Sequence, residues 1–437
     1  MKNRAPITPP AAPTASAART ANAAPTTNPA PTPIRAARTP IRPATVTERC
    51  FFAAAALFIS AGLTFSQTSS KPVLPGSPLP GITPSEQELF RLGREDFTEV
   101  ETAEDGLGPA FNGNSCAICH SVPAIGGVST MTEMRGGYRD EDGKFSALNG
   151  GTLYHLFSTP PHRCQVQIPL EANVIARRAP IALFGAGLVE AILDETILAL
   201  EDPDDRDGDG IRGRAARIMD VATGRERVGK FGWKSQQATL LSFSGDAYRN
   251  EMGITNDLFP DEAALGVTPE QLRLCSPKRG IEDVRDRATG LRGIDKFEVF
   301  MKFLAPIARG PIDATVLAGD SLFRQIGCAA CHVPMLMTGA NANPVFDRKP
   351  VALYSDLLLH DVGTGDGIEQ AAAKAGEIRT PALWGLRFRR PLLHDGSAAT
   401  AADAILRHDK EASTVTEKYR RLSPPDQRQL LAFLSSL

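Results

Sequence analysis

The string Cys-x-x-Cys-His occurs twice in the sequence, at residues 116–120 and at residues 328–332. In this spacing, two thiols can add to the two vinyl groups of one porphyrin while the adjacent histidine lies under the ring. The pattern is the attachment signature of c-type haem. A structural zinc ion held by four thiolates is the alternative. The pairs lie about two hundred residues apart and each is followed directly by histidine, and zinc explains neither feature. We therefore expect two covalently attached haems, held and ligated by Cys116, Cys119, His120, Cys328, Cys331 and His332.

The N-terminal part of the chain differs in composition from the rest. Residues 1–45 are Ala, Pro, Thr and Arg almost throughout and cannot bury enough apolar surface to fold, so we expect a disordered low-complexity extension. The apolar run at residues 51–65 has the length of a secretory h-region. Residues 46–67 are therefore interpreted as a signal peptide, with an uncleaved N-terminal anchor as the alternative. We expect a periplasmic protein that contacts a membrane only if this segment is not cleaved.

Charge also changes along the chain. Residues 1–66 carry seven basic residues and one acidic residue, and loss of their net six positive charges takes the formal charge from −2 to −8. The chain without residues 1–66 is therefore mildly acidic, which argues against nucleic acid as a partner. Of the seven cysteines, Cys164 and Cys275 lie outside the two strings and the presumed signal. In an oxidising compartment they are a candidate disulfide, with two buried thiols as the alternative.

Helix signals precede both strings and end the chain. Thr83, Pro84 and Glu86 form a capping box with proline at the first helical position, and Gly93 and Phe97 follow on one face. The second string is preceded by the same Gly-x-x-x-Phe pattern, Gly319 to Phe323, where a small residue lets another helix cross closely. Ser423 caps a terminal helix with a leucine stripe.

These signals predict a mainly α protein with two cytochrome c-like haem domains, long loops and a large inserted segment in the first domain. The first haem domain is expected at residues 80–305 and the second at residues 311–437. Residues 121–310 read as helices and loops that cover the first haem, with a small hairpin around residues 212–232.

Several longer motifs give the chain a family resemblance over residues 83–437. They begin at Gly113 (Gly-Asn-Ser-Cys-Ala-Ile-Cys-His), Leu183 (Leu-Phe-Gly-Ala-Gly-Leu), Phe231 (Phe-Gly-Trp-Lys), Arg379 (Arg-Thr-Pro-Ala-Leu-Trp) and His394 (His-Asp-Gly). With them the chain resembles the bacterial di-haem peroxidase superfamily, which includes the di-haem cytochrome c peroxidases and MauG-like proteins. It is similar in particular to the branch of di-haem oxidoreductases, sometimes called thiol oxidoreductases.

The resemblance implies a second ligand for the second haem. In the peroxidases a His-Asp-Gly motif precedes the distal methionine by about four helical turns, and the matching position here is His408. We therefore expect two histidines on this iron, which gives a lower potential than His/Met ligation. The other candidates for this ligand are His360, Tyr354, Met335 and Met337. The alternative for His408 itself is an exposed side chain that binds no iron. His394 is expected to be structural, with Asp395 as its partner.

The resemblance also implies catalytic residues at the first haem. The position of the displaceable peroxidase histidine is Gly136, so an open distal face is expected, with His155 and His162 as weaker ligand candidates. Peroxide cleavage needs a group that moves a proton, and Glu251 matches that glutamate, with Gln237 or Gln236 upstream. Trp233 matches the tryptophan between the haems, with Trp384 as the alternative bridge.

One acidic loop suggests a cation. Asp205, Asp207 and Asp209, followed by Gly210, match the start of an oxygen-ligand calcium loop. Position 12 is Ala216 rather than glutamate, so the loop is no true EF-hand, and an acidic solvated turn is the alternative.

The function implied by the resemblance is reduction of hydrogen peroxide or a related oxidant. Electrons would come from a small periplasmic donor, a cytochrome c or a cupredoxin, and a homodimer is possible. The rivals are a non-catalytic di-haem electron carrier and MauG-like oxidation of a partner protein.

Overall fold

The computed structural model describes residues 73–437, apart from 161–163, 165–167, 265–266 and 276–279. The expected low-complexity extension, the signal segment and His162 lie outside the described residues. The described residues belong to one compact unit. Helix makes up 31% and strand 14% of them, which agrees with a mainly α class. None of the described helices is both long and apolar enough to cross a membrane.

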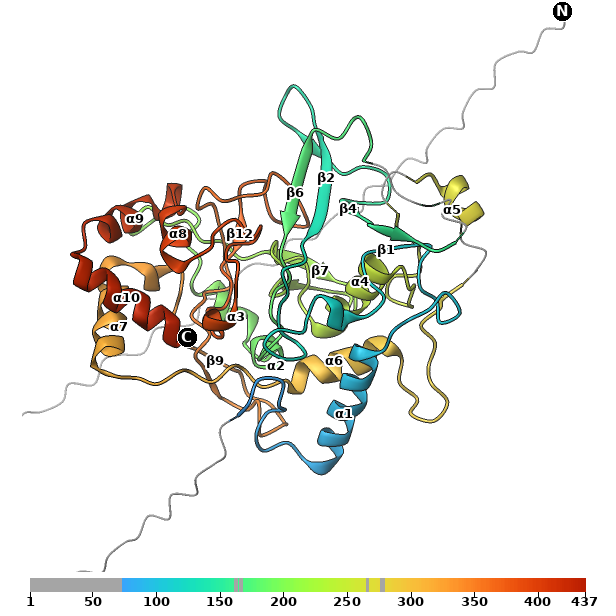
Figure 1. Cartoon of the computed structure of the whole chain (residues 1–437), viewed down its shortest axis with the longest axis horizontal. Helices are drawn as coiled ribbons and strands as arrows, with labels where there is room; N and C mark the ends of the chain where they lie inside the picture. The colour runs from blue at the N-terminus through green and yellow to red at the C-terminus, as the bar shows by residue number, and fades with distance from the viewer. Residues whose placement is uncertain (1–72, 161–163, 165–167, 265–266, 276–279) are drawn as a thin grey trace, which may run out of the picture. The chain divides into compact units, whose positions relative to one another are not determined.

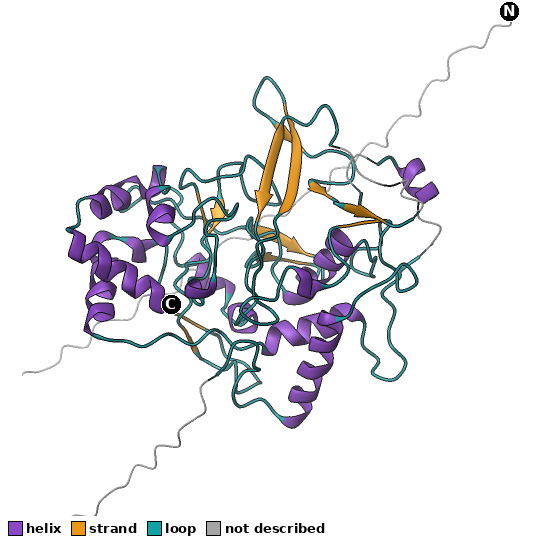
Figure 2. Ribbon diagram, in the orientation of Figure 1, coloured by secondary structure: helices purple, strands orange, loops and turns teal. Residues whose placement is uncertain are grey.

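Short helices and strands alternate along the chain and long loops connect them (Figure 2). The helices are α1 (Pro84–Thr98), α2 (Ala186–Glu190), α3 (Asp194–Leu198), α4 (Leu240–Met252), α5 (Pro269–Cys275), α6 (Gly293–Phe303), α7 (Ala314–Ile326), α8 (Ala401–Leu406), α9 (Ser413–Arg420) and α10 (Pro424–Ser436). The strands are β1 (Ala110–Phe111), β2 (Glu133–Arg139), β3 (Phe145–Ser146), β4 (Leu153–Tyr154), β5 (Phe157–Ser158), β6 (Val174–Arg178), β7 (Arg217–Asp220), β8 (Arg225–Val228), β9 (Leu336–Met337), β10 (Pro350–Val351), β11 (Leu359–His360) and β12 (Ile378–Arg379).

Two pairs of helices cross closely, as the Gly-x-x-x-Phe repeat predicts. A Cβ atom on Gly93 of α1 would lie 2.3 Å from the carbonyl oxygen of Lys296 on α6. A Cβ atom on Gly319 of α7 would lie 2.1 Å from the carbonyl oxygen of Gln429 on α10. Only glycine allows backbones to approach this closely. The α1–α6 pair, joined by α4, and the α7–α10 pair, joined by α8 and α9, form two helical groups (Figure 1).

The helix ends follow the sequence signals. The Thr83 backbone N–H donates to Glu86 Oε2 at 2.7 Å, and the Glu86 N–H donates to Thr83 Oγ1 at 3.3 Å. The Ser423 hydroxyl accepts from the Asp426 N–H, and Pro424 opens α10. Both predicted helix starts are therefore confirmed.

The segment between the two strings contains more sheet than expected. β2 pairs antiparallel with β3, β4 and β6, and Glu133 lies opposite Arg178 in the β2–β6 register. Only the β7–β8 hairpin, with Arg217 opposite Val228, was expected from the sequence, and it is confirmed. β2 was missed because charged Glu133 and Arg135 occupy one of its faces, so the strand lacks the usual apolar alternation.

A disulfide joins Cys164 to Cys275 at the C-terminal end of α5. The two Cα atoms lie 5.6 Å apart, and 111 residues separate the cysteines in sequence. The predicted pairing is confirmed. A crosslink over a loop this long restricts the unfolded chain strongly.

A buried ion network ties the loop at residues 361–378 to the segments that precede it in sequence. Asp366 pairs with Arg178 of β6 at 2.7 Å and with Lys234 at 3.0 Å. The Lys234 ammonium also donates to the carbonyl oxygen of Glu377 at 2.7 Å, and the Lys234 side chain is fully buried. Because buried charges need complete pairing, this network fixes how the loop packs.

We expect Lys234→Met to lower the free energy of unfolding by about 3–5 kcal/mol, because it leaves buried carboxylate and carbonyl oxygens without their cation. Denaturant unfolding followed by circular dichroism measures the loss. Lys410→Met is the control, since its ion pair with Asp361 at 2.7 Å is largely exposed and should contribute less than about 1 kcal/mol. Equal losses in the two variants would contradict the assignment.

Candidate functional site

The two Cys-x-x-Cys-His strings adopt the same local structure. Each begins with a 3₁₀ turn, Cys116–Ile118 or Cys328–Ala330. The backbone N–H of His120 donates to the carbonyl oxygen of Cys116 at 3.1 Å, and that of His332 to Cys328 at 3.0 Å. All four cysteines of the strings are free thiols. Each string therefore presents two thiols and one imidazole from a single tight turn.

The helix before each string packs on its histidine. The rings of Phe97 and His120 lie 6.1 Å apart, and those of Phe323 and His332 lie 6.4 Å apart. Both phenylalanines lie one turn after the glycine at which their helix crosses its partner. The repeat therefore places each histidine against a fixed helix pair.

The ring nitrogens of both histidines are arranged for metal binding. His120 Nδ1 lies 2.9 Å from the carbonyl oxygen of Gly127, and His332 Nδ1 lies 3.1 Å from that of Tyr354. Since a carbonyl can only accept, Nδ1 carries the proton and Nε2 keeps its lone pair. Burial lowers the pKa of both imidazoles, that of His332 to about 4. Both rings are thus neutral at pH 7, as an iron ligand must be.

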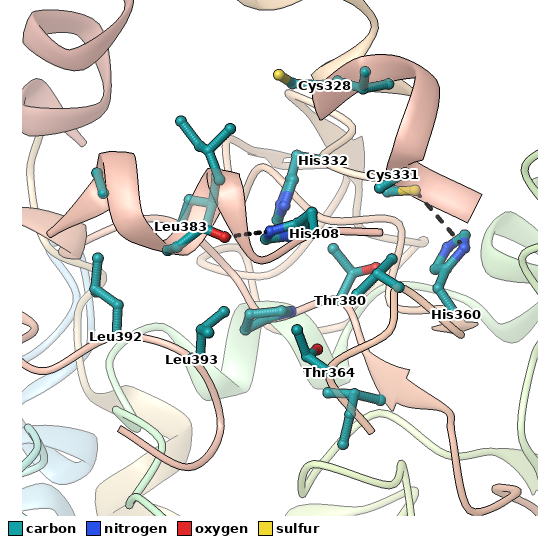
Figure 3. A pocket seen from close by; sticks show the side chains of 18 of the residues that line it. Cys328, Cys331, His332, His360, Thr364, Thr380, Leu383, Leu392, Leu393 and His408 are labelled. Carbon is teal, nitrogen blue, oxygen red and sulfur yellow. Dashed lines mark hydrogen bonds between the residues drawn. The ribbon is translucent and has the colours of Figure 1, made fainter. Parts of the chain in front are cut away.

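The second string borders an apolar cavity. Cys328, Cys331 and His332 line it together with His408, which follows α8 (Figure 3). His408 Nδ1 lies 2.7 Å from the carbonyl oxygen of Ala404, so its Nε2 is also the nitrogen left free. Burial lowers the pKa of His408 as well. The structure therefore brings two neutral histidines to one cavity.

The other candidates for the second ligand of this iron already contact other groups or are exposed. His360 Nε2 lies 2.8 Å from Asp356 and its Nδ1 lies 2.8 Å from Glu411. Despite burial, which acts in the opposite direction, these carboxylates hold the pKa of His360 well above 6.5. The imidazolium has no lone pair for iron. The Tyr354 hydroxyl faces Arg309, while Met335 and Met337 are about half exposed.

Two arginines on the cavity wall lack a carboxylate partner among the described residues. Arg389 Nη2 is buried without a hydrogen bond, and burial lowers the pKa of Arg389 to about 10. Arg379 donates only to the carbonyl oxygens of Gly232 and Thr380, and its pKa is also lowered to about 10 by burial. A buried cation without a counter-ion is costly. A flat apolar ligand that carries acidic groups, such as haem with its propionates, fits this cavity.

Trp233 lines this cavity, and Phe231 and Gly232, which precede it, line a neighbouring one. Its indole N–H donates to the carbonyl oxygen of Ala179 at 2.8 Å, and the Arg389 guanidinium lies 4.9 Å from its ring. The neighbouring cavity is apolar and also borders Val122 and Val128 beyond the first string. Trp384 lines this neighbouring cavity, so each tryptophan borders one of the two cavities. His394 packs edge-on against Trp233 at 6.1 Å, in keeping with a structural role.

A cluster of charged side chains lies beside the first string. Glu251, in the last turn of α4, accepts from Asn112 Nδ2 at 2.9 Å. Burial, and then the charge of Glu133 of β2, raise the pKa of Glu251 well above 4.5. The charge of Glu251 is in turn felt at Cys119, whose pKa is raised to about 11 chiefly by burial. The protonated form of Glu251 is therefore favoured, close to the first string.

The other residues expected at the first string have different surroundings. Gln237 lies near Asp246 of α4, and Gln236 accepts from the Lys234 backbone. His155 Nε2 lies 2.7 Å from the carbonyl oxygen of Asn250, and its buried Nδ1 has no partner among the described residues. A Cβ atom on Gly136 would lie 2.4 Å from the Tyr154 ring.

Sequence reasoning missed four charged residues: Glu133, Arg135, Arg379 and Arg389. Glu133 and Arg135 alternate along β2, which is the pattern of a strand with one polar face. That alternation was the one available signal. Nothing in the sequence marks the two arginines as lacking a partner.

The carboxylate oxygens of Asp205, Asp207 and Asp209 lie within 4.8 Å of one another. They accept backbone N–H groups of the same loop, including Gly210 at 2.9 Å and Ile211 at 2.8 Å. These hydrogen bonds account for the loop geometry, and calcium stays a prediction.

Comparisons with known proteins identify a family. The sequence profile described as "Di-haem oxidoreductase, putative peroxidase" matches residues 166–437, so the first string precedes the matched part. No curated protein matches the chain. Among solved structures, hydrazine synthase of Kuenenia stuttgartiensis under xenon pressure is 14% identical, with a TM-score of 0.38 and coverage of 90% of this chain and 100% of that one.

Two further structures are similar at the same level. A MauG-like protein associated with microbial copper homeostasis is 15% identical, with a TM-score of 0.39 and coverage of 85% and 95%. The diheme peroxidase BthA from Burkholderia thailandensis is 14% identical, with a TM-score of 0.37 and coverage of 84% and 89%. At these scores the structures add no argument to the family match. The profile spans more than half of the chain, and the protein therefore belongs to the di-haem oxidoreductase family of peroxidase-like enzymes.

Proposed function

We propose that this protein is a periplasmic c-type cytochrome that reduces hydrogen peroxide, or a related oxidant, with electrons from a small redox protein. The observation that carries the proposal is the difference between the two strings. The second string shares its cavity with a further histidine, His408. The first lies beside Glu251, a carboxyl group whose pKa burial raises well above 4.5. The arrangement at the second string favours electron transfer, and the arrangement at the first string favours chemistry.

The chain's residues would hold both cofactors in the same way. Cys116 and Cys119 would form thioethers to one haem, and Cys328 and Cys331 to the other. Each string histidine offers Nε2 to iron, and the unpartnered guanidinium of Arg389 would meet a propionate. Bound iron supplies one-electron redox chemistry.

At the second string, His332 and His408 together would hold the metal. Such a site exchanges electrons without binding substrate. Trp233 lines this cavity and would relay electrons toward the first string. A small cytochrome c or cupredoxin suits the role of donor, because it can deliver one electron at a time. The disulfide and the expected signal at residues 46–67 support export.

At the first string, Glu251 would move protons. Reduction of hydrogen peroxide consumes two electrons and two protons and yields two water molecules. The O–O bond breaks more easily when one oxygen is protonated as it leaves. Burial favours the protonated form of Glu251, which lies beside this string, so it is the residue we assign to this step.

Replacement of His408 tests the second site. We expect His408→Ala to convert the second haem from a low-spin to a high-spin optical spectrum and to make it bind cyanide, because one axial nitrogen is lost. His360→Gln is the matched control and should leave the spectrum low-spin, since both ring nitrogens of His360 already bind carboxylates. A change with His360→Gln and none with His408→Ala would reverse the assignment.

Replacement of Glu251 tests the first site and the reaction. We expect Glu251→Gln to lower kcat/KM for hydrogen peroxide by about 10²–10⁴-fold, the usual contribution of a positioned acid. Glu298→Gln is the control, because burial also raises the pKa of Glu298 but this group lies on α6. Absence of peroxide turnover in the wild-type holoprotein, with both irons low-spin and inert to cyanide, would leave an electron carrier instead.

A further inference from the structure

One short segment, residues 379–389, separates the cavity of the second string from the neighbouring cavity. Its residues divide between the two sides: Thr380, Pro381 and Leu383 line only the cavity of the second string, and Ala382, Trp384, Gly385 and Phe388 line only the neighbouring one. Arg379 and Arg389, at the two ends of the segment, line both cavities. The segment is therefore a thin wall with a cation at each end.

We propose that Arg379 and Arg389 form one carboxylate-binding site shared by the two cavities, so that the same pair of cations holds acidic groups of both haems. The inference rests on the haem attachment in the proposed function but not on peroxide reduction.

Arg389 is held in place without the use of its donors. It follows the 3₁₀ turn Leu386–Phe388, and its guanidinium lies over the Trp233 ring at 4.9 Å from the ring centroid. A contact with an aromatic face leaves the N–H groups of a guanidinium free to donate elsewhere. Arg389 Nη2 is buried and has no hydrogen-bond partner among the described residues. Arg389 thus offers a fixed and unused donor to a ligand.

Arg379 is anchored by its backbone neighbours only. It ends β12, and it donates from Nε to the carbonyl oxygen of Gly232 at 2.9 Å and from Nη1 to that of Thr380 at 3.2 Å. Carbonyl oxygens orient a guanidinium but do not neutralise it. Asp356 forms no ion pair with Arg379, and its Oδ2 instead lies 2.8 Å from His360 Nε2.

The two guanidiniums therefore lack a negative charge in the part of the chain that the structure describes. Burial lowers the pKa of each to about 10, so both remain cations at neutral pH. Lys230, which also lines the neighbouring cavity, shows the usual arrangement, because Asp194 pairs with it at 3.0 Å. Two neighbouring buried cations without a counter-ion are costly, and a guanidinium binds a carboxylate through two N–H groups.

Haem carries its two carboxylates on the edge opposite to the vinyl groups, so a haem attached at a string directs them away from that string. The neighbouring cavity begins beside the first string, where Val122 lines it two residues after His120. The wall at residues 379–389 can thus receive carboxylates from both sides. A small inorganic anion from solvent would meet the same cations, and the test separates the two sources.

The test measures the midpoint potentials of both haems in the purified holoprotein by spectroelectrochemical titration. Ferric haem carries one more positive charge than ferrous haem, so a nearby cation favours the reduced form. We expect Arg389→Gln to shift both potentials down, and Arg389→Lys, which keeps the charge, to shift both less than half as far. Arg379→Gln removes the other cation and should again lower both potentials.

Arg387→Gln is the matched control. Arg387 belongs to the same turn, but it donates to the carbonyl oxygens of Leu437 at 2.7 Å and Ala308 at 2.6 Å and lines neither cavity. Both potentials should therefore stay in place in this variant. The mass of each denatured variant shows that two haems are still attached.

The outcomes separate the inference from its alternatives. A shift of only one potential, or of neither in both neutral variants, would overturn the shared site. Wild-type potentials that change with phosphate concentration at constant ionic strength would assign the two cations to a free anion and overturn it as well. Downward shifts of both potentials in a protein without peroxide turnover would keep the shared site and reject the proposed reaction.

Discussion

The close crossing of two helix pairs, at Gly93 and at Gly319, is the constraint on which the arrangement of both strings depends. Each glycine lets its helix approach a partner backbone so closely that a methyl group would not fit. One turn later, Phe97 and Phe323 pack on the string histidines. A tight turn alone would leave each imidazole free to rotate. The helix pair and the carbonyl acceptor at Nδ1 together fix the direction of Nε2.

Buried charge then makes the two sites different. The wall around the second string includes Arg379 and Arg389, neither of which forms an ion pair among the described residues. Around the first string the charged groups are mostly carboxyl groups matched by Arg135. A buried cation without an ion pair favours an acidic ligand, whereas burial of a carboxyl group favours its protonated form. One repeated scaffold can therefore support electron transfer at one end and proton transfer at the other.

Local sequence rules predicted the parts that depend on neighbours in sequence. Four features could be predicted from the sequence: the capping box at Thr83, the crossing glycines, the β7–β8 hairpin and the pairing of Cys164 with Cys275. The first three depend on residue spacing, and the disulfide follows because these two cysteines are the ones left outside the strings and the presumed signal. The β2–β6 pairing was missed because both strands carry charged residues, such as Glu133 and Arg178 in facing positions, and lie far apart in the chain. His408 was identified only through its distance from a family motif, since its own neighbours are polar and resemble a surface turn.

The mass of the denatured, purified protein tests the central claim most directly. Expression in a host competent for cytochrome maturation should yield a polypeptide whose mass exceeds that of the mature chain by two haem groups, because thioether bonds survive unfolding. A mass equal to that of the bare polypeptide after denaturation, from the same host, would contradict the account of both strings.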